Sequence, residues 1–173
     1  DGAFSPAVFI VLGVATLVRI DLAVPYLAVW LFLMAFMPHH RKRTAVWGIG
    51  VLAGFLGFQT VLRYAYYGDI LPATYYLKMT GYPSFLRITR GLAVFWQFIW
   101  RMLPVTFFIP VVALGKEYTR PRGILAWLFA VQCAYSIYVG GDAWEAFGGS
   151  NRYISTVMPL YAVLFAAGLD RLT

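Results

Sequence analysis

Residues 63–91 read RYAYYGDILPATYYLKMTGYPSFLRITRG and form the longest polar interruption between the apolar runs of the chain. The stretch holds six tyrosines and two turn signals, at 68–69 and 81–83. A flexible linker would be rich in Gly, Ser or like charge. Here aromatic rings alternate with cations, a mixture suited to sugars and phosphates, so we interpret this stretch as a binding loop. Its cations are Arg63, Lys78, Arg87 and Arg90.

The composition on either side of this loop places the chain in a bilayer. Hydrophobic residues make up 61% and charged residues 12%, and the mean hydropathy is +0.72, outside the usual range of globular proteins. We therefore predict an all-α polytopic integral membrane protein, a single transmembrane domain over 1–173, with about six transmembrane helices and two outer loops. The six apolar runs are 4–18, 22–37, 45–62, 102–114, 123–139 and 154–169. Most are slightly short for a span, so we expect neighbouring residues to extend several of them.

The net charge of +7 is interpreted segment by segment rather than as a nucleic-acid signal. Tight cationic clusters lie at 41–43 and at 116–122, in short loops that the positive-inside rule places in the cytoplasm. The stretches 63–91 and 140–153 then lie outside. Arg19 and Asp21 face a membrane boundary, where they either pair at the interface or contact substrate.

Residues 85–101 are predicted to form one amphipathic helix at the outer interface. At 100° per residue, Arg87, Arg90, Gln97 and Arg101 share one face. These cations either anchor the helix at lipid phosphates or bind the phosphate of a substrate lipid.

Metal and packing motifs are less specific. His39 and His40 have no carboxylate or thiol at ligand spacing, and Cys133 is interpreted as a packing residue. The sequence therefore names no metal site and no cofactor, and leaves a divalent metal open. Glycines recur at 48, 50, 54 and 57, with one G-x-x-x-G pattern at Gly50 and Gly54, and predict close helix packing.

The predicted outer face collects carboxylates, cations and aromatic rings, whereas no Ser-His-Asp or Cys-His set can be assembled. Carboxylates can act as a base on a sugar hydroxyl, cations can hold a leaving phosphate, and rings can cover sugar faces. The candidate substrate-binding residues are Arg63, Asp69, Tyr75, Tyr76, Lys78, Arg87, Arg90, Asp142, Glu145 and Arg152.

Several of these residues stand in motifs, YYGDILP at 66–72, TYYLK at 74–78 and VGGD at 139–142, with Arg152 just before an apolar run. Together they resemble the GT-C superfamily of polytopic glycosyltransferases, and most closely bacterial members related to the terminal arabinofuranosyltransferase B group. The resemblance implies a cell-envelope enzyme at the outer face of the cytoplasmic membrane. Its donor would be a polyprenyl-phosphate-linked sugar and its acceptor a saccharide or glycoconjugate.

The resemblance also implies that the chain is the C-terminal part of a longer enzyme, because the outer loop that usually carries the catalytic Asp of the superfamily is missing. We therefore name no catalytic base and leave open whether the chain is active alone. The segment between Asp142 and Arg152 is longer than in that family, so a shared contact by the two is not expected. The alternatives are a transporter or flippase module for lipid-linked saccharides and a non-catalytic membrane subunit.

Overall fold

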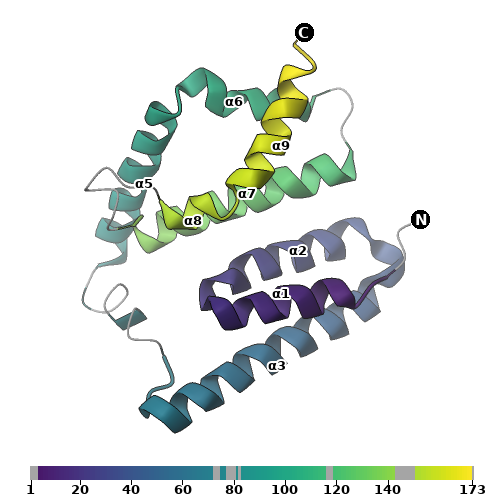
Figure 1. Ribbon diagram of the computed structural model, residues 1–173, viewed down its shortest axis with the longest axis vertical. Coiled ribbons are helices and arrows are strands. Elements are labelled where there is room, and N and C mark those ends of the chain that lie inside the picture. Colours follow the sequence, from purple (N-terminus) through teal and green to yellow (C-terminus); the bar gives the residue numbers. More distant parts are fainter. Residues whose placement is uncertain are drawn as a thin grey trace. The chain divides into compact units, whose positions relative to one another are not determined.

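The computed structural model describes residues 4–71, 75–76, 81, 83–115, 119–142 and 151–172. Within these ranges all regular structure is helical and no strand occurs (Figure 1), which confirms the predicted all-α class. The chain divides into two compact units, Asp1–Thr80 and Gly81–Thr173. The boundary falls inside the polar stretch 63–91. That the two units form one membrane domain stays a prediction, and each unit is described by itself.

The first unit packs two short helices against one long helix (Figure 1). The short helices α1 (Ala7–Val18) and α2 (Ala23–Phe36) are separated by the 3-10 turn η1 (Ile20–Leu22). A second 3-10 turn, η2 (Pro38–His40), leads into α3 (Arg41–Tyr67). α3 ends where Gly68 takes a left-handed conformation at φ 75°, which is the common way for a glycine to terminate a helix.

Polar side chains of α2 fasten it to α3. The Tyr26 hydroxyl donates to the carbonyl of Gly48 at 2.7 Å, and Trp30 Nε1 donates to the carbonyl of Thr44 at 3.1 Å. A Cβ on Gly48 would lie 2.1 Å from the Trp30 ring. Gly48 is therefore the glycine of α3 that lets α2 approach.

The close packing that we predicted for the recurring glycines of α3 is confirmed at Gly48 and is wrong at Gly50, Gly54 and Gly57 within the described residues. A Cβ at any of the latter three positions would meet nothing within 4 Å. At 100° per residue these three glycines lie roughly opposite to Gly48 on α3. Gly50, Gly54 and Gly57 therefore lie on a face of α3 that does not pack against α2.

We predict that Tyr26→Phe lowers the free energy of unfolding by about 1 kcal/mol, the usual net value of a buried hydrogen bond. Tyr26 is fully buried, so the loss should be seen as a lower melting temperature in detergent. Tyr66→Phe is the matched control, because Tyr66 is 81% exposed. Equal melting of the two variants would contradict a role for this bond.

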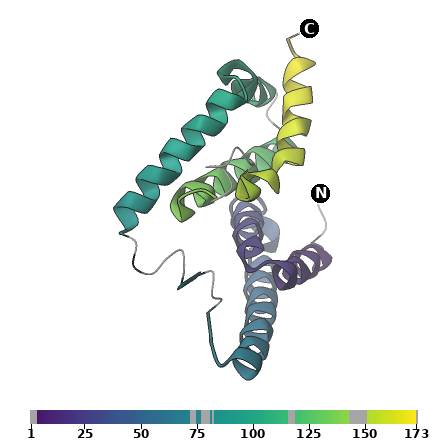
Figure 2. The same cartoon turned by 60° about the vertical axis from the view of Figure 1, so that its left-hand side comes forward.

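In the described part of the second unit, four of the helices contact one another in turn and form a ring, and the short α8 packs against α7 (Figures 1 and 2). Its helices are α5 (Ser84–Arg101), α6 (Pro104–Ala113), α7 (Arg120–Val139), the single turn α8 (Arg152–Ser155) and α9 (Met158–Leu169). α5 packs on α7, α6 packs on α9, and α7 also contacts α9. Between α5 and α6 the chain bends by 88°, at Leu103, whose φ is 63°.

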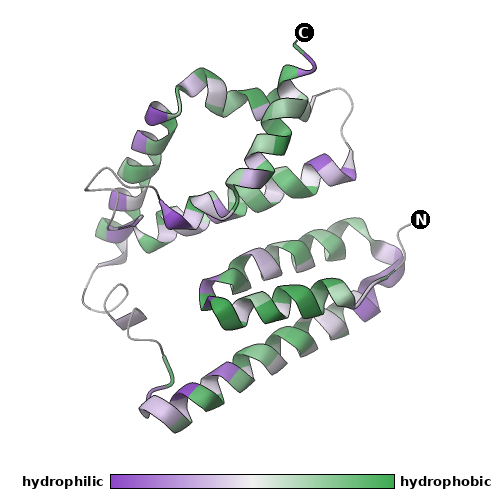
Figure 3. Cartoon of the chain, in the orientation of Figure 1, coloured by the Kyte–Doolittle hydropathy of each residue, from purple (hydrophilic) through white to green (hydrophobic). Residues whose placement is uncertain are grey.

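Within the described residues, fewer helices are long enough to cross a membrane than the six that we predicted. By length and composition two are, Pro38–Tyr67 and Arg120–Val139, and a third if α5 and α6 form one bent span. Hydrophobic residues also predominate along α1 and α2 (Figure 3), but these helices are shorter. The run 102–114 yields only 10 helical residues, starting at Pro104. The run 154–169 is divided at Val157, just before Pro159.

Candidate functional site

A buried carboxylate stands directly after the end of α7. Gly140 and Gly141 both have positive φ, 90° and 77°, a conformation that glycine adopts without steric cost. Their amides bond back to Ile137 and Ser136 at 3.0 and 2.9 Å. This double-glycine turn leads to Asp142, which is only 2% exposed. VGGD therefore encodes a helix stop followed by a buried acid.

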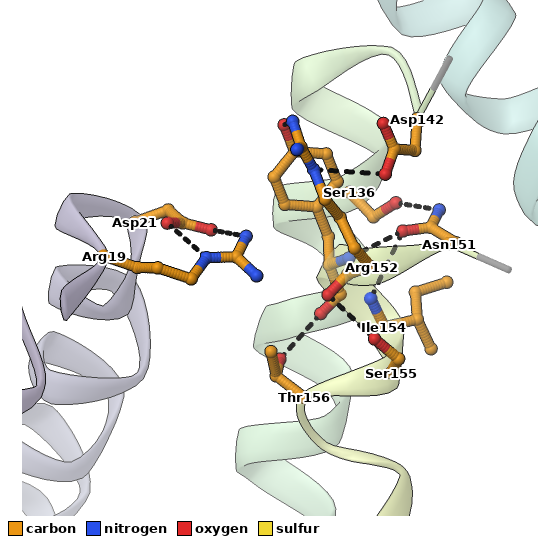
Figure 4. A network of polar contacts seen from close by, with 10 residues as sticks. Arg19, Asp21, Ser136, Asp142, Asn151, Arg152, Ile154, Ser155 and Thr156 are labelled. Carbon is orange, nitrogen blue, oxygen red and sulfur yellow. Dashed lines mark hydrogen bonds and ion pairs between the residues drawn. The ribbon is translucent and has the colours of Figure 1, made fainter. Parts of the chain in front are cut away.

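Asp142 forms an ion pair with Arg152, the first residue of α8. Arg152 Nε lies 3.1 Å from Asp142 Oδ2 (Figure 4). The Arg152 side chain is 45% exposed, so the pair links a buried acid to an accessible guanidinium. We did not expect this contact from the length of the segment between the two residues. That prediction was wrong. The distance between Asp142 and Arg152 is set by the packing of α8 beside α7 and not by the number of residues between them.

Asn151 and Ser136 hold the start of α8 against α7. Asn151 Oδ1 accepts from the amides of Tyr153 and Ile154 at 2.9 and 3.3 Å, which makes it the N-cap of the turn. Asn151 Nδ2 donates to the Ser136 hydroxyl at 2.7 Å (Figure 4). Both residues are buried. Sequence reasoning gave Ser136 no role, and only an Asn just before Arg152 signalled the cap.

Arg87 does not share the exposed cationic face that we predicted for it. The predicted helix itself is confirmed by α5, but Arg87 is only 6% exposed. Its Nε donates to the carbonyl of Tyr138 at 2.9 Å, and its guanidinium lies 4.7 Å from the centre of the Tyr138 ring, within cation–π range. Arg90, Gln97 and Arg101 are exposed, as predicted. A helical wheel cannot show that α7 covers one end of this face.

Arg87 therefore supports the turn that carries Asp142. We predict that Arg87→Gln destabilises the chain by about 1.5 kcal/mol, because hydrogen bonds to charged groups contribute about 1.5–3 kcal/mol and glutamine replaces part of the contact. Thermal melting in detergent measures the loss. Arg90→Gln is the matched control on the same helix and should melt close to wild type. If both variants melt alike, Arg87 does not hold α5 to α7.

The candidate residues of the first unit are more exposed. Asp69 is exposed, and Arg63 donates to the carbonyl of Ile70 at 3.4 Å. Tyr75 and Tyr76 are 41% and 43% exposed and meet edge to face. Lys78 and Glu145 lie outside the described residues. The sequence also predicts that the two outer loops meet over one cavity, with Asp69 or Lys78 on the same rim as Asp142 or Arg152. This stays a prediction, because the two loops fall in separate units.

Arg19 and Asp21 of the first unit form an ion pair. Pairing was one of the two alternatives that we gave for these residues, and contact with substrate was the other. Arg19 Nε and Nη2 lie 3.1 and 2.5 Å from the two carboxylate oxygens of Asp21. This two-point geometry is the favourable arrangement of arginine on a carboxylate. That the pair contacts substrate stays a prediction. In the described part of the chain, no three His, Cys, Asp or Glu residues lie together as a metal site would need.

Comparison of the chain with protein-family models, with curated proteins and with solved structures gave no match. The candidate site is therefore defined by geometry alone: a buried acid, a half-exposed arginine paired with it, and a polar support of Asn151, Ser136 and Arg87 around the end of α7.

Proposed function

We propose that the chain is part of a membrane glycosyltransferase that transfers a sugar from a polyprenyl-phosphate donor to a saccharide or glycoconjugate acceptor. The observation that carries this proposal is the Asp142–Arg152 pair at the end of an apolar helix. Burying a carboxylate is costly unless it is paired and hydrogen-bonded. A helix can end without a buried carboxylate. Ionisable groups that are costly to bury cluster at functional sites.

Arg152 is the group that would contact the donor phosphate. Its side chain keeps 45% of its surface exposed while Nε is paired with Asp142. Nη2 also donates to the Tyr153 hydroxyl at 3.3 Å, and the guanidinium lies 5.3 Å from the centre of the Tyr153 ring. A half-exposed guanidinium held in this way suits phosphate, which arginine binds through a rigid planar fork. Asp142 then orients Arg152, which makes it a positioning residue. No catalytic base is proposed among the described residues.

The proposed setting is the cytoplasmic membrane of a bacterial-type cell, with the site on the outer face. Two or three helices of spanning length support a membrane location. The proposal retains about six membrane-crossing segments, with the short helices α1, α2 and α9 completing their crossings through neighbouring residues. The basic cluster at 41–43 then faces the cytoplasm.

A transporter or flippase for lipid-linked saccharides is the second candidate, and one observation favours it. The 88° bend between α5 and α6 is typical of a broken span, and transporters build substrate sites from discontinuous helices. A non-catalytic membrane subunit is the third candidate, and would need none of these groups to contact substrate.

A transfer assay separates these candidates. The full-length protein is reconstituted in sealed vesicles with a radiolabelled polyprenyl-phosphate sugar and a saccharide acceptor. The proposed function predicts a new glycosidic product, which Arg152→Gln reduces while the exposed, predicted cytoplasmic Arg43→Gln does not. Movement of the lipid-linked sugar between leaflets with no new product would favour a transporter. If neither a new product nor movement of the lipid-linked sugar is detected, the result would favour the non-catalytic subunit.

A further inference from the structure

An apolar cavity of about 430 Å³ lies among α5, α6, α7 and α9 of the second unit. Five of the 14 residues that line it are aromatic, Phe95, Phe107, Phe108, Phe129 and Tyr161. Ala126, Ala130 and Ala134 of α7 also line it. They recur every fourth residue and so share one helix face. Their short side chains leave the space that larger residues would fill.

The cavity offers almost no polar partner to a ligand. The hydroxyl of Tyr161 already donates to the carbonyl of Thr106 at 2.6 Å. The Cys133 thiol is the other polar side-chain group among the lining residues, and it is a weak hydrogen-bonding group. The volume lies within the usual range for small-molecule sites, about 300–1,000 Å³. An occupant must therefore present hydrocarbon over its buried length.

The cavity continues onto the exposed surface of α6. Phe108 and Val111 line the cavity and are nevertheless 56% and 60% exposed. Val105, also on α6, is 76% exposed. In a bilayer, acyl chains cover such an apolar face. A chain that covers α6 can thus reach the cavity without crossing water.

We propose that this cavity binds one acyl chain of a bilayer phospholipid. Among the described residues that line the cavity, none would select a headgroup, which fits an abundant lipid rather than a rare one. The bound chain would fill the space between α6 and α7 and complete the packing of the ring. This inference does not depend on sugar transfer, since any of the three candidate functions would accommodate it.

The test uses the full-length protein in nanodiscs that contain phosphatidylcholine with a diazirine on one acyl chain. After illumination, mass spectrometry maps the labelled peptides. Labelling of the α6 and α7 residues that line the cavity is expected. Ala130→Phe, which fills the cavity, should reduce this labelling about tenfold, equivalent to about 1.4 kcal/mol of chain binding. Ala162→Phe on α9 is the matched control, because Ala162 is exposed and does not line the cavity.

Three results would overturn the proposal. Ala130→Phe could be labelled like wild type at the lining residues. The lining residues could stay unlabelled while the exposed face of α3 is labelled, which would indicate that another protein segment covers them. A diazirine-bearing isoprenoid chain could label the cavity where the acyl chain does not. If Ala130→Phe fails to fold by thermal melting, the smaller change Ala134→Leu takes its place with the same expected direction.

Discussion

Replacing Gly91 with alanine is expected to lower the free energy of unfolding by about 3 kcal/mol, the upper end of the usual cost of overpacking. A Cβ at this position would lie 2.1 Å from the carbonyl oxygen of Ile137 on α7. Because that atom belongs to the backbone, no rotation of a side chain can relieve the clash. α5 would have to move away from α7, and the bond from Arg87 to Tyr138 would weaken with it.

The control for this variant is Gly54→Ala in α3, where a Cβ would meet nothing within 4 Å. Helix propensity alone favours alanine over glycine by about 1 kcal/mol, so this variant should melt at or above the wild-type temperature. Thermal melting in detergent, followed by circular dichroism, compares the two. An unchanged melting temperature for Gly91→Ala would show that α5 and α7 do not approach as closely as described.

Arg152→Met should destabilise the chain by about 2–3 kcal/mol. The change keeps the unbranched stem of the side chain to about the position of Nε and removes the guanidinium charge that pairs with Asp142. Breaking an exposed pair costs up to about 1 kcal/mol, and breaking a buried pair costs about 3–5 kcal/mol. Asp142 is 2% exposed and Arg152 is 45% exposed, so an intermediate value is expected from melting measurements.

A double-mutant cycle isolates the pair from other effects of the substitution. Asp142→Asn removes the buried charge, so the double variant Asp142→Asn/Arg152→Met should lose less stability than the two single losses added together. Contacting charged residues commonly show coupling of about 0.5–3 kcal/mol. Strict additivity would mean that Asp142 and Arg152 do not act as a pair.

The sequence was informative about single helices. Hydropathy located α3 and α7, and the cationic spacing located α5. Local signals also explain why other runs fell short, since Pro104 and Pro159 stand at the first turns of α6 and α9, where proline is best tolerated. We did not weigh these prolines as helix starts, and so expected helices over the whole runs 102–114 and 154–169.

Contacts between helices could not be predicted from the sequence, because they depend on which helix faces pack against each other. Arg87 and Arg90 differ by less than one helical turn, yet α7 covers only Arg87. Gly48 and Gly50 differ by two residues, yet only Gly48 faces Trp30. Asp142 and Arg152 were named as site residues, but their pairing follows from the packing of α8 against α7, where Asn151 also bonds to Ser136, and no local pattern encodes that packing.

The central claim is that Arg152, oriented by Asp142, binds the phosphate of a polyprenyl-phosphate donor. The most direct test is the dissociation constant of the donor for the full-length protein, with Arg152→Gln compared to Arg43→Gln under conditions where both are folded. Charge-assisted bonds are worth about 1.5–3 kcal/mol. We therefore expect Arg152→Gln to bind the donor at least about tenfold more weakly and Arg43→Gln to bind it like wild type. Wild-type affinity in folded Arg152→Gln would contradict the claim.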